Sequence, residues 1–234
     1  MFICVGSSED FSFAKSVGVG LVDSAIGLSA ICLQHAPSHI VFVASAGSYD
    51  SSVNIGDVFY SFCATQIEMS FLQNLSYTPI DNAISSEDSI FSKDFAKDSS
   101  VSHETFLRSI FGVSRSFEVP HVVVNSSNYI TNTSEFNSRM LHAGVRLENM
   151  EFFSVLSVAR HFNVPCVGIF CVSNHVGKDA HNEFKANHVR VKKKLSEFVY
   201  SHFRADFDVD SIKDSMKDSM KDSIKDFQKD SKTR

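Results

Sequence analysis

Four continuous runs of apolar and β-branched residues constrain the fold of this chain more than any other feature of its sequence. These runs lack the apolar–polar alternation of a half-exposed strand. They are typical of strands that are covered on both faces, as in a parallel sheet. The runs are Phe2–Val5, His39–Val43, His121–Val124 and Val164–Val172.

Helical patterns lie between and beside these runs. In Leu21–Leu33 and in Glu148–Phe162 the apolar residues recur at close to helical spacing. Strands that alternate with helices predict an α/β fold, here a three-layer sandwich with a central, mostly parallel sheet. A further strand-like segment at Asp57–Cys63 indicates that the sheet is mixed.

The chain divides into one expected domain and a tail. It has 234 residues, of which 43 % are hydrophobic, so residues 1–200 suffice for one catalytic domain with a sizeable core. From about Val209 the sequence repeats every four residues, in units such as DSIK and DSMK. Asp–Lys pairs three residues apart add only about 0.2–0.5 kcal/mol each. We therefore expect residues 201–234 to be a charged marginal helix or a disordered tail, rather than an interaction helix.

The overall charge and the cysteine pattern argue against several classes of protein. A net charge of −5 and a pI of about 6.0 do not favour binding to nucleic acid. The apolar N-terminal run ends at Ser7, too early for a signal peptide, and no run of about 18 apolar residues could span a membrane. The five cysteines include no C-x-x-C pair, so we expect neither a disulfide framework nor a metal site. These features predict a cytoplasmic protein.

Small or polar clusters adjoin the ends of the predicted strands. Ligands of parallel α/β folds bind beyond the carboxyl ends of the strands. Strand-to-helix turns are polar in most proteins, so one such cluster would carry little weight, but four at corresponding positions favour a common site. The clusters are Ala44–Tyr49, Asn125–Ile130, Ser173–His175 and Glu148–Glu151.

Glu151 is the most unusual residue of these clusters. If Asn149 caps the following helix, Glu151 lies in the first turn, where the helix dipole favours a carboxylate by about 0.3–1 kcal/mol. On that interpretation it is a solvated acid, as Glu148 is expected to be. The spacing, however, places Glu151 on the same face as Val155 and Val158. A buried carboxylate needs hydrogen-bond donors, and the two adjacent hydroxyls of a ribose would satisfy both of its oxygens.

The order of these motifs resembles the nucleoside phosphorylase-I superfamily, which includes purine nucleoside and uridine phosphorylases and the methylthioadenosine/S-adenosylhomocysteine nucleosidases. The resemblance covers roughly residues 1–190. Its most specific element is Met-Glu at a helix start, followed about twenty residues later by a Val-Ser-Asn strand end. The matching segments are Gly18–Ala25, VFVASAGSY at 41–49, Asn54–Val58, Val124–Ile130 and 148–174.

The resemblance implies a role in binding the nucleoside for four residues. Met150 and Glu151 would lie under the sugar, with Glu151 accepting hydrogen bonds from the ribose hydroxyls. Tyr129 would stack on the base, and the backbone of Ile130 would line the edge of the base. The fold implied is that of the nucleoside phosphorylases and hydrolases.

The resemblance also implies where the nucleophile lies. Ser45, with the backbone of Ala46 and Gly47, matches the turn that faces phosphate in phosphorylases or water in nucleosidases. Phosphate would then be a co-substrate, and no other cofactor is expected. The small-molecule partners would be a nucleoside and phosphate, and the family resemblance implies a homo-oligomer.

Asn174 matches the side chain that contacts the leaving purine near N7. Cleaving an N-glycosidic bond places negative charge on the base, so stabilising the leaving base is the main catalytic task. An Asp here could act as a general acid toward a 6-aminopurine, whereas an Asn can only donate its amide N–H. Asn at this position resembles the 6-oxopurine phosphorylases. We therefore expect phosphorolysis of purine ribonucleosides, preferably inosine or guanosine, with Asn174 and Glu151 as the catalytic pair.

Two further interpretations remain open. Phe42 stands where the bacterial hexameric phosphorylases have a phosphate-binding Arg, which favours a hydrolytic nucleosidase of the methylthioadenosine/adenosylhomocysteine or futalosine type. Nucleosidases carry a water-activating Glu near the end of the first strand, and Glu9 and Asp10 lie there. We expect these two acids to be surface residues, with the role of base as the alternative. A non-catalytic nucleoside-binding protein is the remaining hypothesis.

Overall fold

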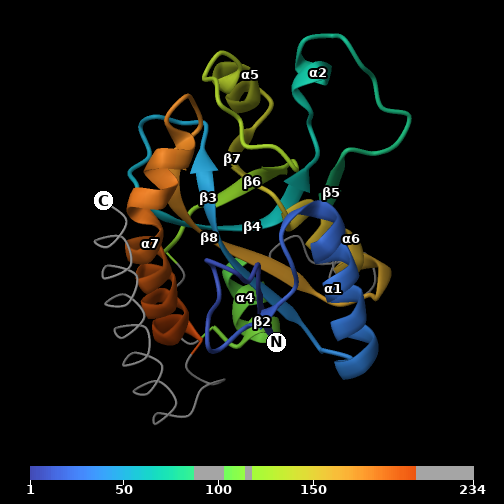
Figure 1. The fold of residues 1–234 in the computed structure, drawn as a ribbon. Coiled ribbons are helices and arrows are strands. Elements are labelled where there is room, and N and C mark those ends of the chain that lie inside the picture. Colours follow the sequence, from blue (N-terminus) through green and yellow to red (C-terminus); the bar gives the residue numbers. More distant parts are fainter. Residues whose placement is uncertain (87–102, 114–117, 204–234) are drawn as a thin grey trace.

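The computed structural model describes residues 1–86, 103–113 and 118–203 (Figure 1). Most of the repeat-containing tail predicted at 201–234 lies outside the described residues, so the predicted domain boundary stays a prediction. Among the described residues, no helix is both long enough and apolar enough to cross a membrane.

The described residues form alternating strands and helices, labelled as in Figure 1. The strands are β1 (Phe2–Cys4), β2 (Lys15–Ser16), β3 (Ile40–Ser48), β4 (Val58–Thr65), β5 (Ala83–Ser85), β6 (His121–Ser126), β7 (Val145–Asn149) and β8 (Cys166–His175). The helices are α1 (Gly20–His35), α2 (Met69–Leu72), α4 (His103–Phe111), α5 (Asn137–His142), α6 (Phe152–His161) and α7 (Ala180–His202).

The strands belong to one mixed sheet. Its order is β2-β1-β3-β7-β6-β4-β5, and β8 pairs with both β3 and β4. β3 is parallel to β1 and β8, and β6 is parallel to β4 and β7, whereas the β3–β7, β4–β5 and β4–β8 pairs are antiparallel. Because β3, β8, β4, β6 and β7 pair in a closed circuit, the sheet curves into a ring instead of lying flat. The predicted α/β fold with a mixed sheet is confirmed.

Helices cover the sheet on two sides, and each side has its own apolar core. α1 and α6 lie on one side and α7 on the other (Figure 1). Leu28 of α1 and Leu156 of α6 belong to one core cluster, whereas Leu195 of α7 and Phe111 of α4 belong to the second. This is the layered arrangement that buries both faces of a sheet.

Two strands extend further than their apolar runs predicted. β3 continues through Ser48 and β8 through His175, so the polar clusters at 44–49 and 173–175 lie mostly inside strands. Their backbones remain in the ladder, with Gly47 opposite Asn174 and Ser48 opposite His175 after a register shift at Ala46. Parallel pairing brings these polar ends together.

The expected helix at 148–162 is in part a strand. Residues 145–149 pair with β6 and β3, and α6 begins only at Phe152. Glu148 therefore lies in β7 and is not a first-turn acid, and Glu151 is the N-cap residue instead of a first-turn residue. The backbone hydrogen bonds of two neighbouring strands outweigh the helical spacing of the side chains here.

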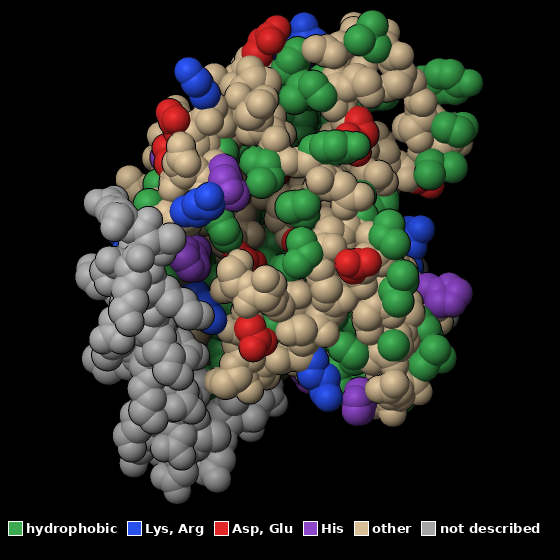
Figure 2. All heavy atoms as spheres, viewed as in Figure 1, with side chains coloured by type: hydrophobic (Ala, Val, Ile, Leu, Met, Phe, Trp, Pro, Cys, Tyr) green, Lys and Arg blue, Asp and Glu red, His purple; other side chains and the backbone are tan. Residues whose placement is uncertain are grey.

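α1 turns mostly small residues toward the body of the protein. Ser24, Leu28 and Cys32 are buried, and a side chain at Gly27 would overlap the carbonyl oxygen of Val17. Many apolar side chains that suggested this helix are instead exposed, and apolar side chains also gather over the segment between α2 and β5 (Figure 2). The exposed apolar side chains include Val22, Ile26, Leu33, Leu75, Tyr77 and Ile80. The homo-oligomer that the sequence predicts stays a prediction.

We predict that Gly168→Ala destabilises the fold strongly. A Cβ at Gly168 would lie 2.7 Å from Cε2 of Phe152 and 2.7 Å from Cζ of Phe170, two rings buried in the core. Overpacking of this kind costs about 1–3 kcal/mol or more. Urea denaturation measures the change in the free energy of unfolding.

Gly177→Ala is the matched control, because its Cβ would meet Ser134 only at 3.9 Å, an ordinary contact. We expect this variant to differ from wild type by less than about 0.5 kcal/mol. Equal stability of the two variants would show that the absence of a side chain at Gly168 is not needed for Phe152 to pack against β8.

Candidate active site

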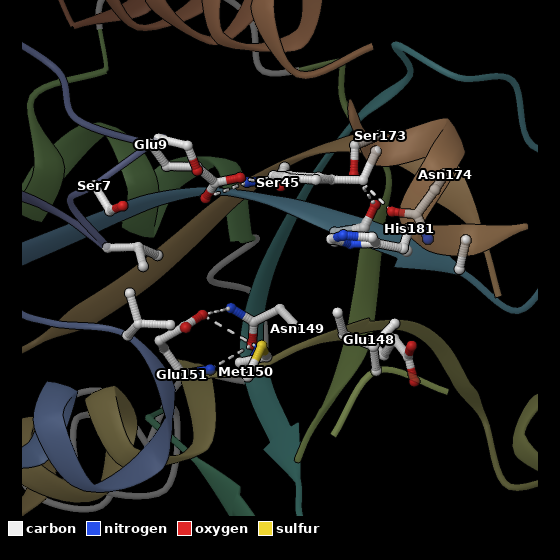
Figure 3. Close-up of a pocket in the computed structure, with 18 of the residues that line it drawn as sticks. Ser7, Glu9, Ser45, Glu148, Asn149, Met150, Glu151, Ser173, Asn174 and His181 are labelled. Atoms are coloured by element: carbon white, nitrogen blue, oxygen red, sulfur yellow. Dashed lines mark hydrogen bonds between the residues drawn. The ribbon is translucent and has the colours of Figure 1, made fainter. Parts of the chain in front are cut away.

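A cavity of about 300 Å³ opens where the carboxyl ends of β3 and β8 meet the junction between β7 and α6 (Figure 3). The structure brings every residue of the predicted site together around it. From the strand ends come Ser45, Gly47 and Asn174, from the loop after β6 come Tyr129 and Ile130, and from the β7–α6 junction come Met150 and Glu151.

Glu151 is a buried carboxylate, with 4 % of its surface exposed. Its Oε1 accepts a hydrogen bond of 2.9 Å from the backbone N–H of Gly20, the first residue of α1. Its Oε2 accepts from the Asn149 side-chain amide at 2.9 Å and from the Met150 backbone N–H at 3.2 Å. A carboxylate has about four acceptor sites, so these three donors leave capacity for a ligand hydroxyl.

Asn149 holds the start of α6 in place. Its Oδ1 accepts from the backbone N–H groups of Glu151 at 3.2 Å and Phe152 at 3.0 Å, as a helix cap does. Asn149 thus makes the hydrogen bonds expected of a cap, but the helix begins at Phe152, two residues later than a cap at Asn149 implies, and Glu151 is the N-cap residue. Glu151, at the N-cap position, points into the cavity beside Met150 (Figure 3).

The environment raises the pKa of Glu151 to about 7. Burial is the main cause, because it disfavours the charged form, and the nearby charge of Glu9 raises the pKa further. The N–H groups of Gly20 and Met150 stabilise the carboxylate and oppose this shift. Glu151 is therefore ionised mainly above neutral pH.

Glu9 faces the same cavity, which corrects the expectation that it is a surface acid. The Ser45 hydroxyl donates a hydrogen bond to its Oε1, and the Ser45 backbone N–H donates to its Oε2 at 3.3 Å (Figure 3). Burial raises the pKa of Glu9, whereas these two donors and the nearby charges of His188 and Lys192 lower it. Asp10 is exposed, as expected. The signal that could have placed Glu9 is its position in the loop that follows β1, since polar residues at other strand ends line the cavity too.

Asn174 is buried and fixed in orientation. Its Oδ1 accepts a hydrogen bond of 2.8 Å from the Ser173 hydroxyl, and its Nδ2 donates to the His175 carbonyl at 3.3 Å. Nδ2 would lie 2.9 Å from a Cβ placed on Gly47. With its oxygen occupied, the amide presents its second N–H as the group available to a ligand.

Tyr129 and Ile130 form an open wall of the cavity. Tyr129 is 76 % exposed and Ile130 is 52 % exposed, and both lie in the loop that follows β6. The sequence did not predict that His181 and Phe184 of α7 also line the cavity. No residue type in the turn before α7 distinguished this segment from an ordinary surface helix.

Among the described residues that line the cavity, none is Lys or Arg. Phe42, the position matched to a phosphate-binding Arg, is fully buried. The centroid of its ring lies 5.9 Å from the ring centroid of Phe152 and 6.0 Å from that of Phe170. It belongs to the core beneath the cavity. The described residues also contain no group of three or more His, Cys, Asp or Glu side chains arranged to hold a metal ion.

Comparison with known proteins gives the family and the fold. Residues 12–204 match the family model of the phosphorylase superfamily. No curated protein matches the chain at a significant level.

Several solved structures are similar. A methylthioadenosine/S-adenosylhomocysteine nucleosidase from Helicobacter pylori is 18 % identical, with a TM-score of 0.60 over 80 % of this chain and 77 % of that one. The futalosine hydrolase of the same organism is 19 % identical, with a TM-score of 0.60 over the same shares. A methylthioadenosine/S-adenosylhomocysteine nucleosidase from Streptococcus pneumoniae is 12 % identical, with a TM-score of 0.63 over 86 % and 96 %. At these identities the likeness establishes the fold.

We predict that Glu9→Gln lowers the pKa of Glu151. The negative charge of Glu9 helps to raise that pKa to about 7, so removing the charge favours ionisation of Glu151 at lower pH. The carboxyl carbon of Glu151, followed by NMR in ¹³C-labelled protein, reports its titration directly.

Asp10→Asn is the control, because it removes an exposed neighbouring charge that does not contribute to this shift. We expect it to leave the titration of Glu151 unchanged. The interpretation fails if Glu151 titrates at the same pH with and without Glu9.

Proposed function

The chain belongs to the phosphorylase superfamily, and from this premise we propose that it cleaves the N-glycosidic bond of a purine ribonucleoside with water as the nucleophile. Phosphorolysis was the first expectation from the sequence. The carboxylate of Glu9 favours the hydrolytic alternative. The same alternative agrees with the nucleosidases and the futalosine hydrolase among the similar structures.

One contact carries the proposal: the hydroxyl and backbone N–H of Ser45 donate to Glu9. Ser45 was expected to help seat phosphate, but its donors are occupied by a carboxylate. A second anion beside this carboxylate would be repelled. The charges of Lys192 and His188 act on Glu9 and oppose part of that repulsion, but neither residue lines the cavity, and no described lining residue is Lys or Arg. A neutral water molecule carries no such penalty and needs a base, which Glu9 supplies.

The arrangement supports a separate role for each acid around the sugar. Glu151, with Met150 beside it, accepts hydrogen bonds from the ribose hydroxyls. Glu9 takes a proton from water as the water oxygen bonds to C1′. The C1′–N9 bond breaks, and its electron pair leaves with the base. Burial raises the pKa of Glu9, which makes this carboxylate a stronger proton acceptor at neutral pH than an exposed one.

Asn174 acts on the leaving base. Asn174 lines the cavity, and its second amide N–H stabilises negative charge that develops near N7, as a preorganised donor does. The amide has no proton to give, so a base that leaves readily without an acid is favoured. We therefore retain the preference for 6-oxopurines over 6-aminopurines. Tyr129 stacks on the base, and Ile130 lines its edge.

Inosine hydrolysis tests the proposal. We expect hypoxanthine to be released at the same rate with and without phosphate, and Glu9→Gln to lower kcat by about 10²- to 10⁴-fold, as loss of a general base does. Asp10→Asn should keep the wild-type rate. Strict dependence on phosphate would establish phosphorolysis instead, and binding of nucleosides without turnover would establish a non-catalytic role.

Glu151→Ala tests the ribose contact separately. Loss of a hydrogen bond to a charged group costs about 1.5–3 kcal/mol, so we expect kcat/KM for inosine to fall by about 10- to 100-fold. The affinity for free hypoxanthine, which lacks the sugar, should not change. Equal losses for inosine and hypoxanthine would mean that Glu151 shapes the cavity and does not bind ribose.

A further inference from the structure

The last residues of β8, which include Asn174, are held by a helix as well as by the sheet. β4 pairs with β8 as far as Cys171, and backbone hydrogen bonds from Gly56 and to Asp57 extend this contact to Val172. Beyond Val172, two polar side chains of α7 bind the backbone of β8. The end of the strand therefore depends on α7 for part of its hydrogen bonding.

These two side chains bind the peptide groups on either side of Asn174. Oε2 of Glu183 accepts a hydrogen bond of 2.8 Å from the backbone N–H of His175, in the peptide group after Asn174. Nδ2 of Asn187 donates at 3.3 Å to the carbonyl oxygen of Ser173, in the peptide group before it. The same Nδ2 donates to the carbonyl oxygen of Glu183 at 2.7 Å, which fixes the Asn187 side chain.

Glu183 also acts on the amide of Asn174 through His175. The carbonyl oxygen of His175 accepts the hydrogen bond from Nδ2 of Asn174. The His175 ring is held as well, with Nδ1 3.5 Å from Oε2 of Glu183 and Nε2 2.9 Å from the carbonyl oxygen of Val53. Both charged side chains are about one-third exposed, so the contact with the backbone N–H matters more than the ion pair. Glu183 thus fixes the residue whose carbonyl directs the Asn174 amide.

The first turn of α7 belongs to the site although Glu183 itself does not face the ligand. His181 of this turn lines the cavity with Asn174 (Figure 3), and so does Phe184. Among the described residues that line the cavity, neither Glu183 nor Asn187 is included. Their effect on a reaction must therefore pass through Asn174. A shift of about 1 Å in a group that contacts the reacting molecule can lower a rate by about 100-fold.

We propose that Glu183 and Asn187 are positioning residues that hold the backbone on both sides of Asn174, so that its amide N–H is fixed toward the leaving base. The proposal rests on the proposed function for the role of Asn174. It extends that function to a helix that the sequence motifs did not indicate. A donor stabilises developing charge best when it is already oriented, because the reaction then spends no free energy on turning it.

A double-mutant cycle on inosine hydrolysis tests the proposal. Asn174→Ala should lower kcat by about 100-fold, as loss of a preorganised donor does. We expect Glu183→Ala to lower kcat by about 10-fold and to change KM by less than about 2-fold, because the displaced amide acts in the transition state. In the Asn174→Ala background, Glu183→Ala should cause no further loss, since no amide remains to be positioned. A second full loss in that background overturns the proposal.

Two further variants separate positioning from a general effect on the helix. Glu197→Ala removes an exposed acid of α7 that lies 3.9 Å from Lys193, and it should keep the wild-type kcat. Glu183→Gln keeps an acceptor oxygen for the His175 N–H, so most of the lost rate should return. No recovery with Gln would overturn the role of this hydrogen bond.

Asn187→Ala replaces Glu183→Ala if the latter does not fold. It removes the contact with the Ser173 carbonyl, and we again expect a lower kcat that disappears in the Asn174→Ala background. Asn182→Ala, at an exposed position of the same helix, is its control. An unchanged kcat in Asn187→Ala overturns the proposal.

The orientation of the Asn174 amide can also be followed without any turnover. In ¹⁵N-labelled protein, the side-chain N–H signals that disappear in Asn174→Ala belong to this residue. We expect Glu183→Ala to shift these signals, because the His175 carbonyl that accepts from the amide is no longer fixed. Glu197→Ala should leave them in place. Unchanged signals in Glu183→Ala overturn the proposal.

The two proposals fail in different ways. Shifted Asn174 signals in a protein that hydrolyses no nucleoside would remove the proposed function and keep Glu183 as the residue that positions the amide. Hydrolysis of inosine, with a rate and Asn174 signals that do not depend on Glu183, would keep the proposed function and remove this inference.

Discussion

At Gly47 the backbone of β3 is hydrogen-bonded to β8 on one side and to β7 on the other, and the rest of the site depends on this junction. The parallel β3–β8 ladder carries Asn174 to the carboxyl edge of the sheet. The antiparallel β3–β7 contact brings Glu148 to the same place and sets the point where the chain leaves β7 for α6. Glu151 follows three residues later, so one crossing of strands positions both acids.

The cavity holds three carboxyl groups and, among the described lining residues, no Lys or Arg. Burial raises the pKa of Glu9, Glu148 and Glu151, and each is held by neutral donors: the Ser45 hydroxyl, the hydroxyls of Tyr49 and Thr131, and amide N–H groups around Glu151. Neutral donors stabilise a carboxylate less than a cation does. Glu9 is stabilised in addition by the charges of His188 and Lys192. With three carboxyl groups on its lining, the site suits neutral ligands rich in hydroxyl and N–H groups better than anions.

Several features of the site were accessible to sequence reasoning because they depend on neighbours in the chain. The Met-Glu pair at 150–151 and the Asn at 174 follow from local motifs, and the structure places both in the cavity. Glu9 and Glu148 were misjudged for one reason. The contact with Ser45 that holds Glu9 in the cavity, and the pairing that converts 145–149 into a strand, both join residues that are distant in sequence.

The sequence by itself determined the alternation of strands and helices, because continuous apolar runs need cover on both faces and helical spacing needs one buried side. It also determined which residue types were available at the strand ends. Only the tertiary structure decided which acids are buried, since that depends on strands β3, β7 and β8 meeting at a glycine. The contact between Ser45 and Glu9, 36 residues apart, is the observation on which the proposal of water as nucleophile rests, and no local pattern encodes it.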